Sequence, residues 1–302
     1  MNEIQKRIGN VWSVRAQERG TDGGRTRWNL SETVLRHISE RICGEPVADL
    51  LEARDTLLRG ISPSLPYAKG ISIGCGTGRK EMRLVERGLV AHFDLFELSE
   101  TVIALGRQEL ARRGLSDKIV FHHADAFRAG LPAGGYDFVY WDNALHHMPD
   151  AEAAVRWSKE VLRPGGCFFL FDYVGPSRFQ WTDEQVALVK NVLASMDDRY
   201  FVIPGTEYMW KKEPNRQTVE EIMRDDPSEA ADSESILPAF AAHFPLGTVI
   251  PLGGLLYVLG LDGILVNIPE DSELLRRILK MDAMLSSAGH NYYAAAYAFV
   301  DR

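Results

Sequence analysis

Cysteine is scarce in this chain: among 302 residues there are three, Cys43, Cys75 and Cys167. Three scattered cysteines are too few for a disulfide framework or a thiolate metal site, which indicates a reducing compartment. Basic residues are outnumbered as well, and the formal net charge of −8 argues against a nucleic-acid partner, which normally requires a basic face. We therefore expect a cytoplasmic protein that does not bind nucleic acid.

The chain also lacks a convincing membrane segment. Residues 1–6 do not have the basic and apolar regions of a signal peptide, so we expect no export. Residues 244–261 contain no charge and reach the length of a membrane span, but prolines and glycines interrupt the run. We expect a buried strand at 248–252, a turn and a core helix over 253–268 there, and no membrane insertion.

The most informative stretch that is present is a short apolar run leading directly into glycines, residues 71–78. Gly74, Gly76 and Gly78 are spaced two apart, and only glycine turns this tightly while leaving room for a ligand. A dinucleotide-binding loop has the spacing G-x-G-x-x-G instead. The pattern therefore predicts a strand, a ligand loop and a helix from about Arg79, with a nucleoside-like ligand other than NAD.

Four further strand-like runs follow, and polar side chains stand at their carboxyl ends. The runs are 92–96, 119–123, 136–141 and 167–171, and the acids at their ends are Glu97, Asp125, Asp142 and Asp172. In open α/β sheets ligands bind at the carboxyl ends of the strands, so these acids predict one site. Glu97 lies 19 residues after Gly78, which is the distance at which an acid reaches ribose hydroxyls.

In this combination the chain resembles the class I S-adenosylmethionine (SAM)-dependent methyltransferases. Residues 71–78 are similar to the glycine motif of the family, Glu97 to its ribose acid, Asp125 and Ala126 to its adenine-edge pair, and 162–166 to the turn before its fifth strand. The family usually has Asp or Glu two residues before the first glycine, where this chain has Ser72. The resemblance implies SAM as the cofactor and S-adenosylhomocysteine as its product.

The resemblance covers residues 65–175 and implies a fold. That fold is α/β, a doubly wound, mostly parallel, seven-stranded Rossmann-like sheet with N-terminal helices and a helical cap insertion. We divide the chain into an N-terminal helical lid (1–60), a SAM-binding α/β core (61–172), a substrate-cap insertion (173–243) and C-terminal strands and helices that complete the sheet (244–302). The alternation of strands and helices in the core predicts parallel strands, and the insertion is too long for an ordinary connection.

Local signals predict the ends of several elements. Ser31 and Asp150 are expected helix caps, and Gly88 and Gly114 are expected to end two helices. Residues 291–300 are strand-like, and the resemblance makes them the seventh strand, with 248–252 the sixth and one of the two antiparallel to the rest. The acidic stretch 225–229 is interpreted as a solvated loop.

The glycine pattern and the resemblance together assign cofactor binding to ten residues. They are Gly74, Cys75, Gly76, Gly78, Glu97, Leu98, Asp125, Ala126, Asp142 and Asn143. Cys75 is interpreted as a small filler of the loop and not as a nucleophile.

The candidate catalytic residues are His146, His147 and Tyr173, which follow the fourth and fifth strands. Histidine has an unperturbed pKa near the operating pH, so either histidine is a candidate base for a hydroxyl nucleophile. The alternatives are that one of them is a structural hydrogen-bonding group and that alignment alone carries the reaction. Some O-methyltransferases of this fold hold a divalent ion at the positions of Asp142 and Asp172, but here Tyr173 follows in place of Asn, so we expect no metal.

Trp12, Arg178, Trp181 and Tyr208 are the candidate substrate-binding residues, the first in the lid and the others in the insertion. Basic residues of the insertion, Arg178, Lys211, Lys212 and Arg216, are of the kind that binds phosphate. The expected function is therefore O-methylation of a small molecule, with a sugar or a nucleotide- or lipid-linked sugar tested first. The alternatives are N- or C-methylation of a secondary metabolite, and a non-catalytic binding partner built on the same fold.

Overall fold

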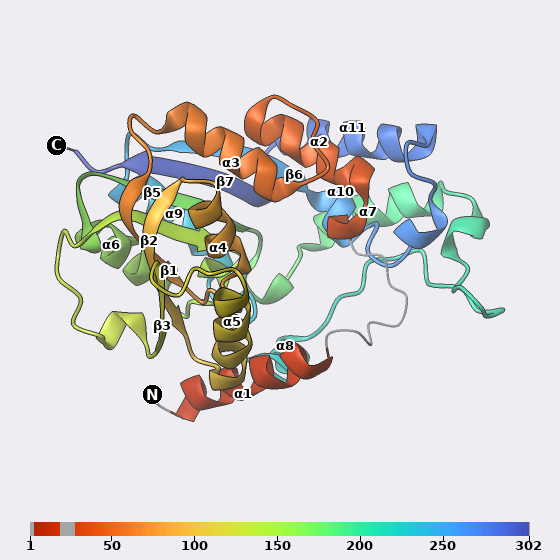
Figure 1. The fold of residues 1–302 in the computed structure, drawn as a ribbon. Helices are drawn as coiled ribbons and strands as arrows, with labels where there is room; N and C mark the ends of the chain where they lie inside the picture. The colour runs from red at the N-terminus through yellow and green to blue at the C-terminus, as the bar shows by residue number, and fades with distance from the viewer. Residues whose placement is uncertain (1–2, 19–27, 302) are drawn as a thin grey trace.

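The computed structural model describes residues 3–18 and 28–301, and its centre is one seven-stranded sheet in the order β3-β2-β1-β4-β5-β7-β6 (Figure 1). The strands are β1 (Tyr67–Ile73), β2 (Val90–Glu97), β3 (Ile119–His123), β4 (Tyr136–Asp142), β5 (Leu162–Tyr173), β6 (Thr248–Gly254) and β7 (Asn291–Phe299). β1 to β5 are parallel, whereas β7 runs antiparallel to both β5 and β6. The mostly parallel, seven-stranded sheet that the sequence predicts is confirmed.

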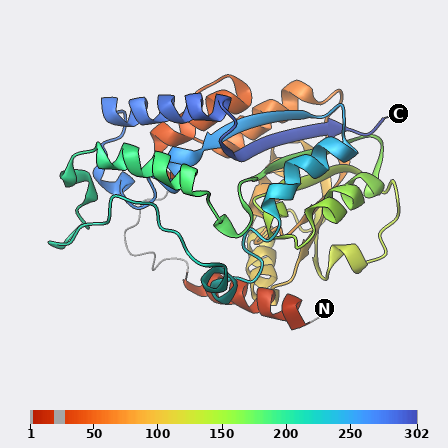
Figure 2. The same ribbon diagram turned by 180° about the vertical axis from the view of Figure 1, so that it is seen from behind.

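Helices cover both faces of this sheet (Figures 1 and 2). They are α1 (Glu3–Glu18), α2 (Glu32–Cys43), α3 (Leu50–Ile61), α4 (Arg79–Glu86), α5 (Glu100–Arg112), α6 (Ala151–Val161), α7 (Asp183–Ala194), α8 (Val219–Asp225), α9 (Ile236–His243), α10 (Leu255–Leu259) and α11 (Glu273–Ser287). α3, α4 and α5 share a core with one face, and α6 and α9 share a core with the other. α2 and α11 pack beside β6.

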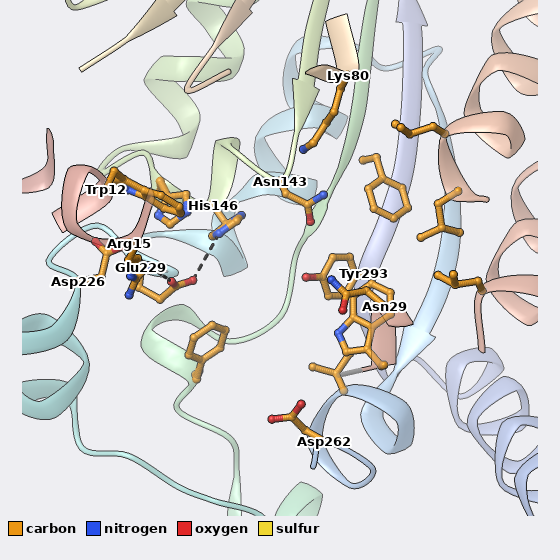
Figure 3. A pocket seen from close by; sticks show the side chains of 18 of the residues that line it. Trp12, Arg15, Asn29, Lys80, Asn143, His146, Asp226, Glu229, Asp262 and Tyr293 are labelled. Atoms are coloured by element: carbon orange, nitrogen blue, oxygen red, sulfur yellow. Dashed lines mark hydrogen bonds and ion pairs between the residues drawn. The ribbon is translucent and has the colours of Figure 1, made fainter. Parts of the chain in front are cut away.

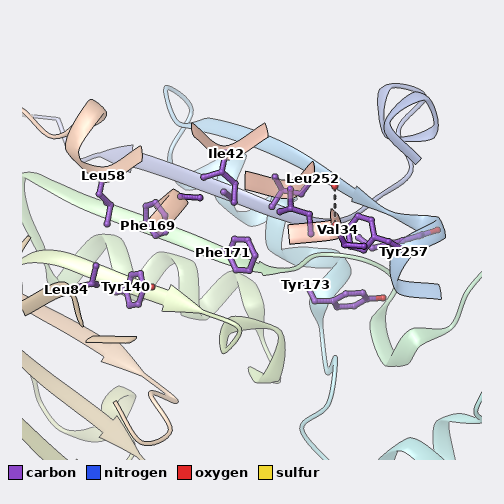
Figure 4. Close-up of a cluster of buried hydrophobic side chains, with 14 of the residues drawn as sticks. Val34, Ile42, Leu58, Leu84, Tyr140, Phe169, Phe171, Tyr173, Leu252 and Tyr257 are labelled. Carbon is purple, nitrogen blue, oxygen red and sulfur yellow. Dashed lines mark hydrogen bonds between the residues drawn. The ribbon is translucent and has the colours of Figure 1, made fainter. Parts of the chain in front are cut away.

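Side chains of the central strands alternate between these two cores. Phe138 and Tyr140 of β4 pack on the side of α3 and α4, whereas Val139 and Trp141 pack on the side of α6 and α9. Figure 4 shows the first of these cores, in which the ring of Tyr140 stacks on that of Phe169 with centroids 5.8 Å apart. Apolar residues on both faces are what a parallel strand buried between two helical layers requires.

The predicted ends of several helices are confirmed. The side chain of Ser31 accepts a hydrogen bond from the Val34 N–H at the start of α2, and Asp150 accepts one from the Ala153 N–H at the start of α6. Gly88 and Gly114 follow α4 and α5 with φ of 68° and 67°. This left-handed region strains other residues, so glycine stops each helix at low cost.

The charge-free run 244–261 forms β6 and α10, and the described residues contain no helix with the length and apolar character of a membrane span. The expected helix over 253–268 is wrong, because α10 extends only over Leu255–Leu259. Gly253 and Gly254 still belong to β6, with φ of 78° and 112° at a shift in strand register. Gly260 then follows the last helical residue, and the chain continues in a short turn.

The segment between β5 and β6 leaves the sheet and returns to it. α9 packs against α6, with Phe240 in the core on that face. α8 instead reaches α1, where the guanidinium of Arg7 donates to the carbonyls of Met223 and Arg224 at 3.1 and 3.2 Å (Figure 2). Residues far apart in the sequence thus meet beyond the carboxyl ends of the strands.

Candidate active site

The glycine loop turns the chain between β1 and α4. Gly74, Gly76 and Gly78 have φ of 64°, 58° and 69°, which explains why each of them is glycine. A Cβ atom on Gly78 would lie 2.7 Å from the side chain of Leu95, whereas one on Gly76 would meet nothing within 4 Å. The backbone of Gly76 therefore faces open space in which a ligand fits.

That space belongs to a cavity of about 720 Å³. Predicted cofactor-binding residues that line it are Gly74, Cys75, Gly76, Glu97, Leu98, Asp125, Ala126, Asp142 and Asn143. Gly78 lies behind the loop, against Leu95 and Phe121. A cavity of this size, with a glycine loop at one end and acids along one wall, fits a nucleoside with an attached amino-acid chain.

Glu97 joins the ends of β1 and β2 through its carboxylate. Its Oε1 accepts hydrogen bonds from the N–H groups of Leu98 and Ser99 at 2.7 and 2.9 Å, and its Oε2 accepts one from Gly76 at 3.1 Å. Burial raises the pKa of Glu97, and the three N–H groups act against this rise. The carboxylate is therefore held rigidly at the cavity wall as an acceptor for ligand hydroxyls.

Asp125 lies at the next strand end, where an exocyclic amine of a base would need an acceptor. Its Oδ1 accepts from the Phe127 N–H at 3.0 Å, and its Oδ2 accepts from Nε2 of Gln5 at 2.6 Å. The cavity here is walled by Phe127 and by residues of α1, namely Ile4, Gln5, Ile8 and Trp12. Helix α1 thus forms one side of the candidate cofactor site.

Asp142, at the end of β4, is the centre of a buried ion network. Its Oδ2 accepts from Arg54 and from the hydroxyl of Tyr140, both at 2.6 Å. Its Oδ1 accepts from Lys80 at 2.9 Å and from Asn143 at 2.7 Å. Burial raises the pKa of Asp142, but Arg54 and Lys80 lower it, with a net fall to about 2. Asp142 is therefore ionised and fixes Asn143 and Lys80 at the cavity.

Asp172, on β5, fixes the loop that follows β4, residues 143–150, which we call the β4 loop. Its Oδ2 accepts from the N–H groups of Ala144 and Leu145 at 3.0 and 2.7 Å, and its Oδ1 accepts from the Tyr173 N–H at 2.8 Å. The same Oδ1 lies 2.5 Å from Nδ1 of His146. A cation bridging Asp142 and Asp172 would have to displace these donors, so the arrangement gives no support to a metal at the two strand ends.

His147 is held by the segment after α8. Its Nδ1 lies 3.1 Å from the hydroxyl oxygen of Ser228, which itself donates to Asp226 at 2.6 Å. Because the Ser228 hydrogen points to Asp226, Nδ1 of His147 carries the hydrogen of that contact. Burial and the adjacent His146 lower the pKa of His147 to about 4. The ring of Trp12 packs edge-on against the ring of His147, with the ring centroids 5.2 Å apart.

The acidic stretch 225–229 is not the solvated loop that the sequence predicts. Asp226 is 1% exposed, and Arg15 of α1 lies 2.9 Å from its Oδ2. Oε1 of Glu229 lies 3.5 Å from Nε2 of His146, and Oε2 lies 3.7 Å from Arg15 (Figure 3). The prediction failed because partners from α1 and from the β4 loop, distant in sequence, neutralise these acids.

A second cavity, of about 1080 Å³, adjoins the first. Residues that line both are Trp12, Lys80, Asn143 and His147. Its wall is aromatic on several sides, through Trp28, Phe171, Phe179 and Tyr293. Figure 3 shows His146 and Glu229 directed toward each other on one side of this cavity, with Lys80 and Asn143 above and Tyr293 opposite.

Several candidate residues do not come to these cavities. Tyr173 is buried, and its hydroxyl donates to the carbonyl of Pro176 at 3.1 Å. Trp181 is 4% exposed and packs in the core, whereas Tyr208 is 68% exposed. Like Arg178, these three are absent from the lining of both cavities, so the structure does not bring them together with His146, His147 and Trp12.

The basic residues of the insertion are paired away from the cavities as well. Arg178 donates to the carbonyl of Glu229 at 2.9 Å. The other ion pairs are Lys211–Glu213, Lys212–Asp198 and Arg216–Asp183. None of these four basic residues lines either cavity, so they give no support to a phosphate-bearing acceptor.

Sequence reasoning missed Arg54, Lys80 and Glu229. Lys80 carried a usable signal, because a cation in the first helical turn after a glycine loop stays near whatever that loop binds. The others carried none, because their partners come from other elements. Ser72 also has an unforeseen partner: its hydroxyl donates to Oε1 of the buried Glu81 at 2.7 Å, so an acidic side chain does lie behind the loop.

The Rossmann-like sheet and the nucleoside-sized cavity at its glycine loop define a SAM-binding class of protein. Residues 71–166 match the family model described as a methyltransferase domain. The chain is 31% identical over 160 residues to the 27-O-demethylrifamycin SV methyltransferase of Amycolatopsis mediterranei. The aligned region covers 50% of this chain and 58% of the relative. It is 25% identical over 191 residues to the ubiquinone/menaquinone biosynthesis C-methyltransferase of Brucella canis, covering 56% and 70%.

Among solved structures, the chain resembles a geranyl diphosphate C-methyltransferase from Streptomyces coelicolor A3(2), determined with Mg²⁺, geranyl diphosphate and S-adenosylhomocysteine. The TM-score is 0.57 at 13% identity, with 99% of this chain and 98% of the other covered, and such a likeness shows the fold. Residues 71–166 thus carry a methyltransferase domain, and the chain is similar to methyltransferases over about half of its length. Its match spans little more than half of the rifamycin methyltransferase.

Proposed function

We propose that this protein transfers the methyl group of SAM to a hydroxyl oxygen of a small organic molecule. The observation that carries the proposal is the pair of adjoining cavities, of about 720 and 1080 Å³, with Trp12, Lys80, Asn143 and His147 lining both. A donor in the first and an acceptor in the second would meet at these shared residues. Alignment of the reacting atoms is the main contribution of an enzyme to such a displacement.

The residues of the smaller cavity suit SAM. Glu97 offers a fixed carboxylate to the ribose, Asp125 and Phe127 offer an acceptor and an apolar wall to the adenine, and the backbone of Gly76 leaves room beside it. When bound, SAM supplies an electrophilic methyl group on a sulfonium. The Asp142 network holds Lys80 and Asn143 at the boundary between the cavities, where they orient both molecules.

The lining of the larger cavity favours an aromatic or polycyclic hydroxy compound as the acceptor. Trp28, Phe171, Phe179 and Tyr293 supply ring faces and edges for such a molecule. The name of the rifamycin methyltransferase relative, which refers to an O-demethylated compound, agrees with transfer to oxygen. A sugar, linked or not to a nucleotide or lipid, ranks second because the basic residues of the insertion lie elsewhere. C-methylation is the second candidate reaction, favoured by the name of the Brucella relative.

Two measurements test the proposal in sequence. Calorimetry should first show that SAM binds, and that NAD does not. The protein is then incubated with SAM and a panel of acceptors that includes hydroquinone, 2-naphthol, polycyclic hydroxy compounds and free and nucleotide-linked sugars, and mass spectrometry detects products heavier by one methyl group. Methylation of a phenol or polycyclic hydroxy compound supports the proposal. Absence of SAM binding refutes it, and exclusive methylation of sugars refutes the acceptor class.

A further inference from the structure

His146 faces a carboxylate at each of its ring nitrogens. Nδ1 lies 2.5 Å from Oδ1 of Asp172, and Nε2 lies 3.5 Å from Oε1 of Glu229. Asp172 is fully buried, and both of its oxygens accept hydrogen bonds from backbone N–H groups, three in all. An oxygen that accepts in this way is an acceptor toward His146 as well, so Nδ1 of His146 carries a hydrogen.

The second nitrogen is constrained in the same way. If Nε2 had no hydrogen, its lone pair would face the oxygen of Glu229, and two acceptors would repel each other. Arg15, 3.7 Å from the other oxygen of Glu229, helps to keep that carboxylate ionised. Nε2 therefore carries a hydrogen too, and His146 is an imidazolium. Burial lowers the pKa of His146, but Asp172 and Glu229 raise it, with a net value of about 10.

An imidazolium donates hydrogen bonds and cannot take up a further proton. The 3.5 Å separation of Nε2 and Oε1 is too long for a good hydrogen bond. An oxygen atom beside the pair, however, can lie within hydrogen-bonding distance of both. Both residues line the larger cavity, so an acceptor hydroxyl can enter there, accept from Nε2 and donate to Oε1.

We infer that Glu229 is the catalytic group that receives the proton of the acceptor hydroxyl, and that His146 holds the acceptor oxygen by donating a hydrogen bond. The inference rests on the proposed methyl transfer to oxygen. The acceptor oxygen forms the new bond to the methyl carbon, the electron pair of the broken C–S bond stays on sulfur, and the hydroxyl proton passes to the Glu229 carboxylate. One positive and one negative charge disappear together, which balances the step.

A weak base is sufficient at this position. Burial raises the pKa of Glu229, but His146, His147 and Arg15 lower it, with a net value of about 2. As the oxygen bonds to the methyl carbon it acquires positive charge, so its proton becomes far more acidic than that of the free hydroxyl. The transfer to a carboxylate is then favourable, and no strong base is needed before the bond forms.

The titratable and charged groups near His146 and Glu229 include Asp172 and Tyr173 of β5, Arg15 of α1, Arg178, Asp226 and His147. Asp172 is saturated with donors, and Asp226 accepts from Arg15 and from Ser228. The Tyr173 hydroxyl donates to a carbonyl. His147 remains as a competing base, since its Nδ1 carries the hydrogen and its other ring nitrogen has a lone pair.

The protonation state of His146 is measured first, by nitrogen NMR of the full-length protein labelled in histidine and loaded with S-adenosylhomocysteine. We expect His146 to remain cationic through pH 7, and its pKa to fall by about one unit or more in Glu229→Gln, because one of its two carboxylate partners has lost its charge. Glu234→Gln, an exposed position in the same segment that lines neither cavity, is the control and should leave the pKa unchanged. A neutral His146 at pH 7 in the parent would overturn the inference, whether or not an acceptor is known.

Turnover is then compared with hydroquinone, or with the phenol methylated most rapidly in the panel. Glu229→Gln should lose about 10²- to 10⁴-fold in kcat/KM while SAM binds as in the parent, and Glu234→Gln should retain parental rates. The parental kcat/KM should be level from about pH 5 to pH 9, because the pKa of Glu229 lies below this range, whereas His146 as the base would make it rise toward pH 10. The pKa of His147 also lies below this range, so the variants, and not the pH profile, separate Glu229 from His147. Near-parental turnover of Glu229→Gln, or loss of turnover in His147→Asn alone, would overturn the inference. If the parent binds no SAM or methylates nothing, it is the proposed function that fails.

Discussion

At the residue scale, the site depends on carboxylates whose partners are already fixed before a ligand arrives. Glu97 is held by three backbone N–H groups, Asp142 by two cations, a hydroxyl and an amide, and Asp172 by backbone groups and His146. Side chains held in this way lose little conformational entropy when a ligand binds, so more of the interaction energy appears as affinity. Each acid therefore serves as a rigid acceptor or as an anchor for its neighbours.

The role of Glu97 gives the first prediction. Glu97→Ala should weaken SAM binding by about 10- to 150-fold, equivalent to about 1.5 to 3 kcal/mol, because a hydrogen bond to an ionised group is lost. Isothermal titration calorimetry measures the change. Glu100→Ala, an exposed position in the first turn of α5, is the matched control and should bind SAM as the parent does. Equal affinities of parent and Glu97→Ala would remove Glu97 from the cofactor site.

Glu81 gives a prediction about stability and pH. Burial raises the pKa of Glu81 from 4.5 to about 7, with Lys80 and Ser72 acting against the rise. Below pH 4.5 the carboxyl is neutral in both states; between pH 4.5 and about 7 the unfolded chain ionises while the folded chain keeps its proton. Stability from this group is therefore present at low pH and is lost as the pH rises to about 7.

Comparison with Glu81→Gln isolates this effect. Between pH 4.5 and about 7, the free energy of unfolding of the parent should fall relative to that of the variant by about 3 kcal/mol. Above about pH 7 the difference between the two proteins should stay constant. Urea denaturation at a series of pH values gives both free energies. A difference between the two proteins that does not change with pH would show that Glu81 ionises normally in the folded state.

At the element scale, α1 closes both cavities with little burial of its own. Among the residues of α1 whose side chains are described, only Gly9 is buried, and a Cβ atom there would lie 2.6 Å from the carbonyl oxygen of Leu98. Polar contacts tie the helix to its surroundings, through Arg7 and Arg15 to the segment of α8 and through Gln5 to Asp125. We therefore propose that α1 contributes to ligand binding more than to the stability of the fold.

Removal of residues 1–18 tests whether α1 serves ligand binding more than stability. The truncated chain should keep the melting temperature of the parent within a few degrees, because the cores on the two faces of the sheet remain intact. It should bind SAM at least about tenfold more weakly, because α1 forms one wall of the smaller cavity. Gly9→Ala is the matched point variant, and we expect the same direction of change since the added methyl group pushes α1 away from Leu98. Unchanged SAM affinity in both proteins would contradict a closing role for α1.

The elements also show what the sequence can and cannot predict. The glycine loop, the strand ends and the caps at Ser31 and Asp150 depend on neighbours a few residues away, so the local sequence predicts them. The pairing of Glu229 with His146, and of Arg54 with Asp142, depends on how distant segments pack. The acidic stretch 225–229 looked solvated for the same reason: sequence records the charges of that segment but not the cations that meet it.

At the scale of the whole molecule, each of the four parts predicted from the sequence contributes to the larger cavity. Trp12 comes from the N-terminal helices, Asn143 from the α/β core, Glu229 from the insertion and Tyr293 from the last strand. Figure 3 shows these residues around one space. The α/β core, which is the part recognised by family resemblance, therefore holds most of the candidate cofactor site but only a fraction of the acceptor site. This explains why the cofactor was predictable and the acceptor was not.

Transfer of a methyl group to oxygen is the central claim, and one spectrum tests it most directly. The protein is incubated with SAM carrying a ¹³C-labelled methyl group and with the phenol methylated most rapidly in the panel, and the carbon spectrum of the product is recorded. The account predicts one new labelled resonance at the position of a methyl group bonded to oxygen, and its loss in Glu229→Gln. A labelled methyl resonance at the position of a methyl group on carbon or nitrogen, or no new resonance beside bound SAM, would contradict it.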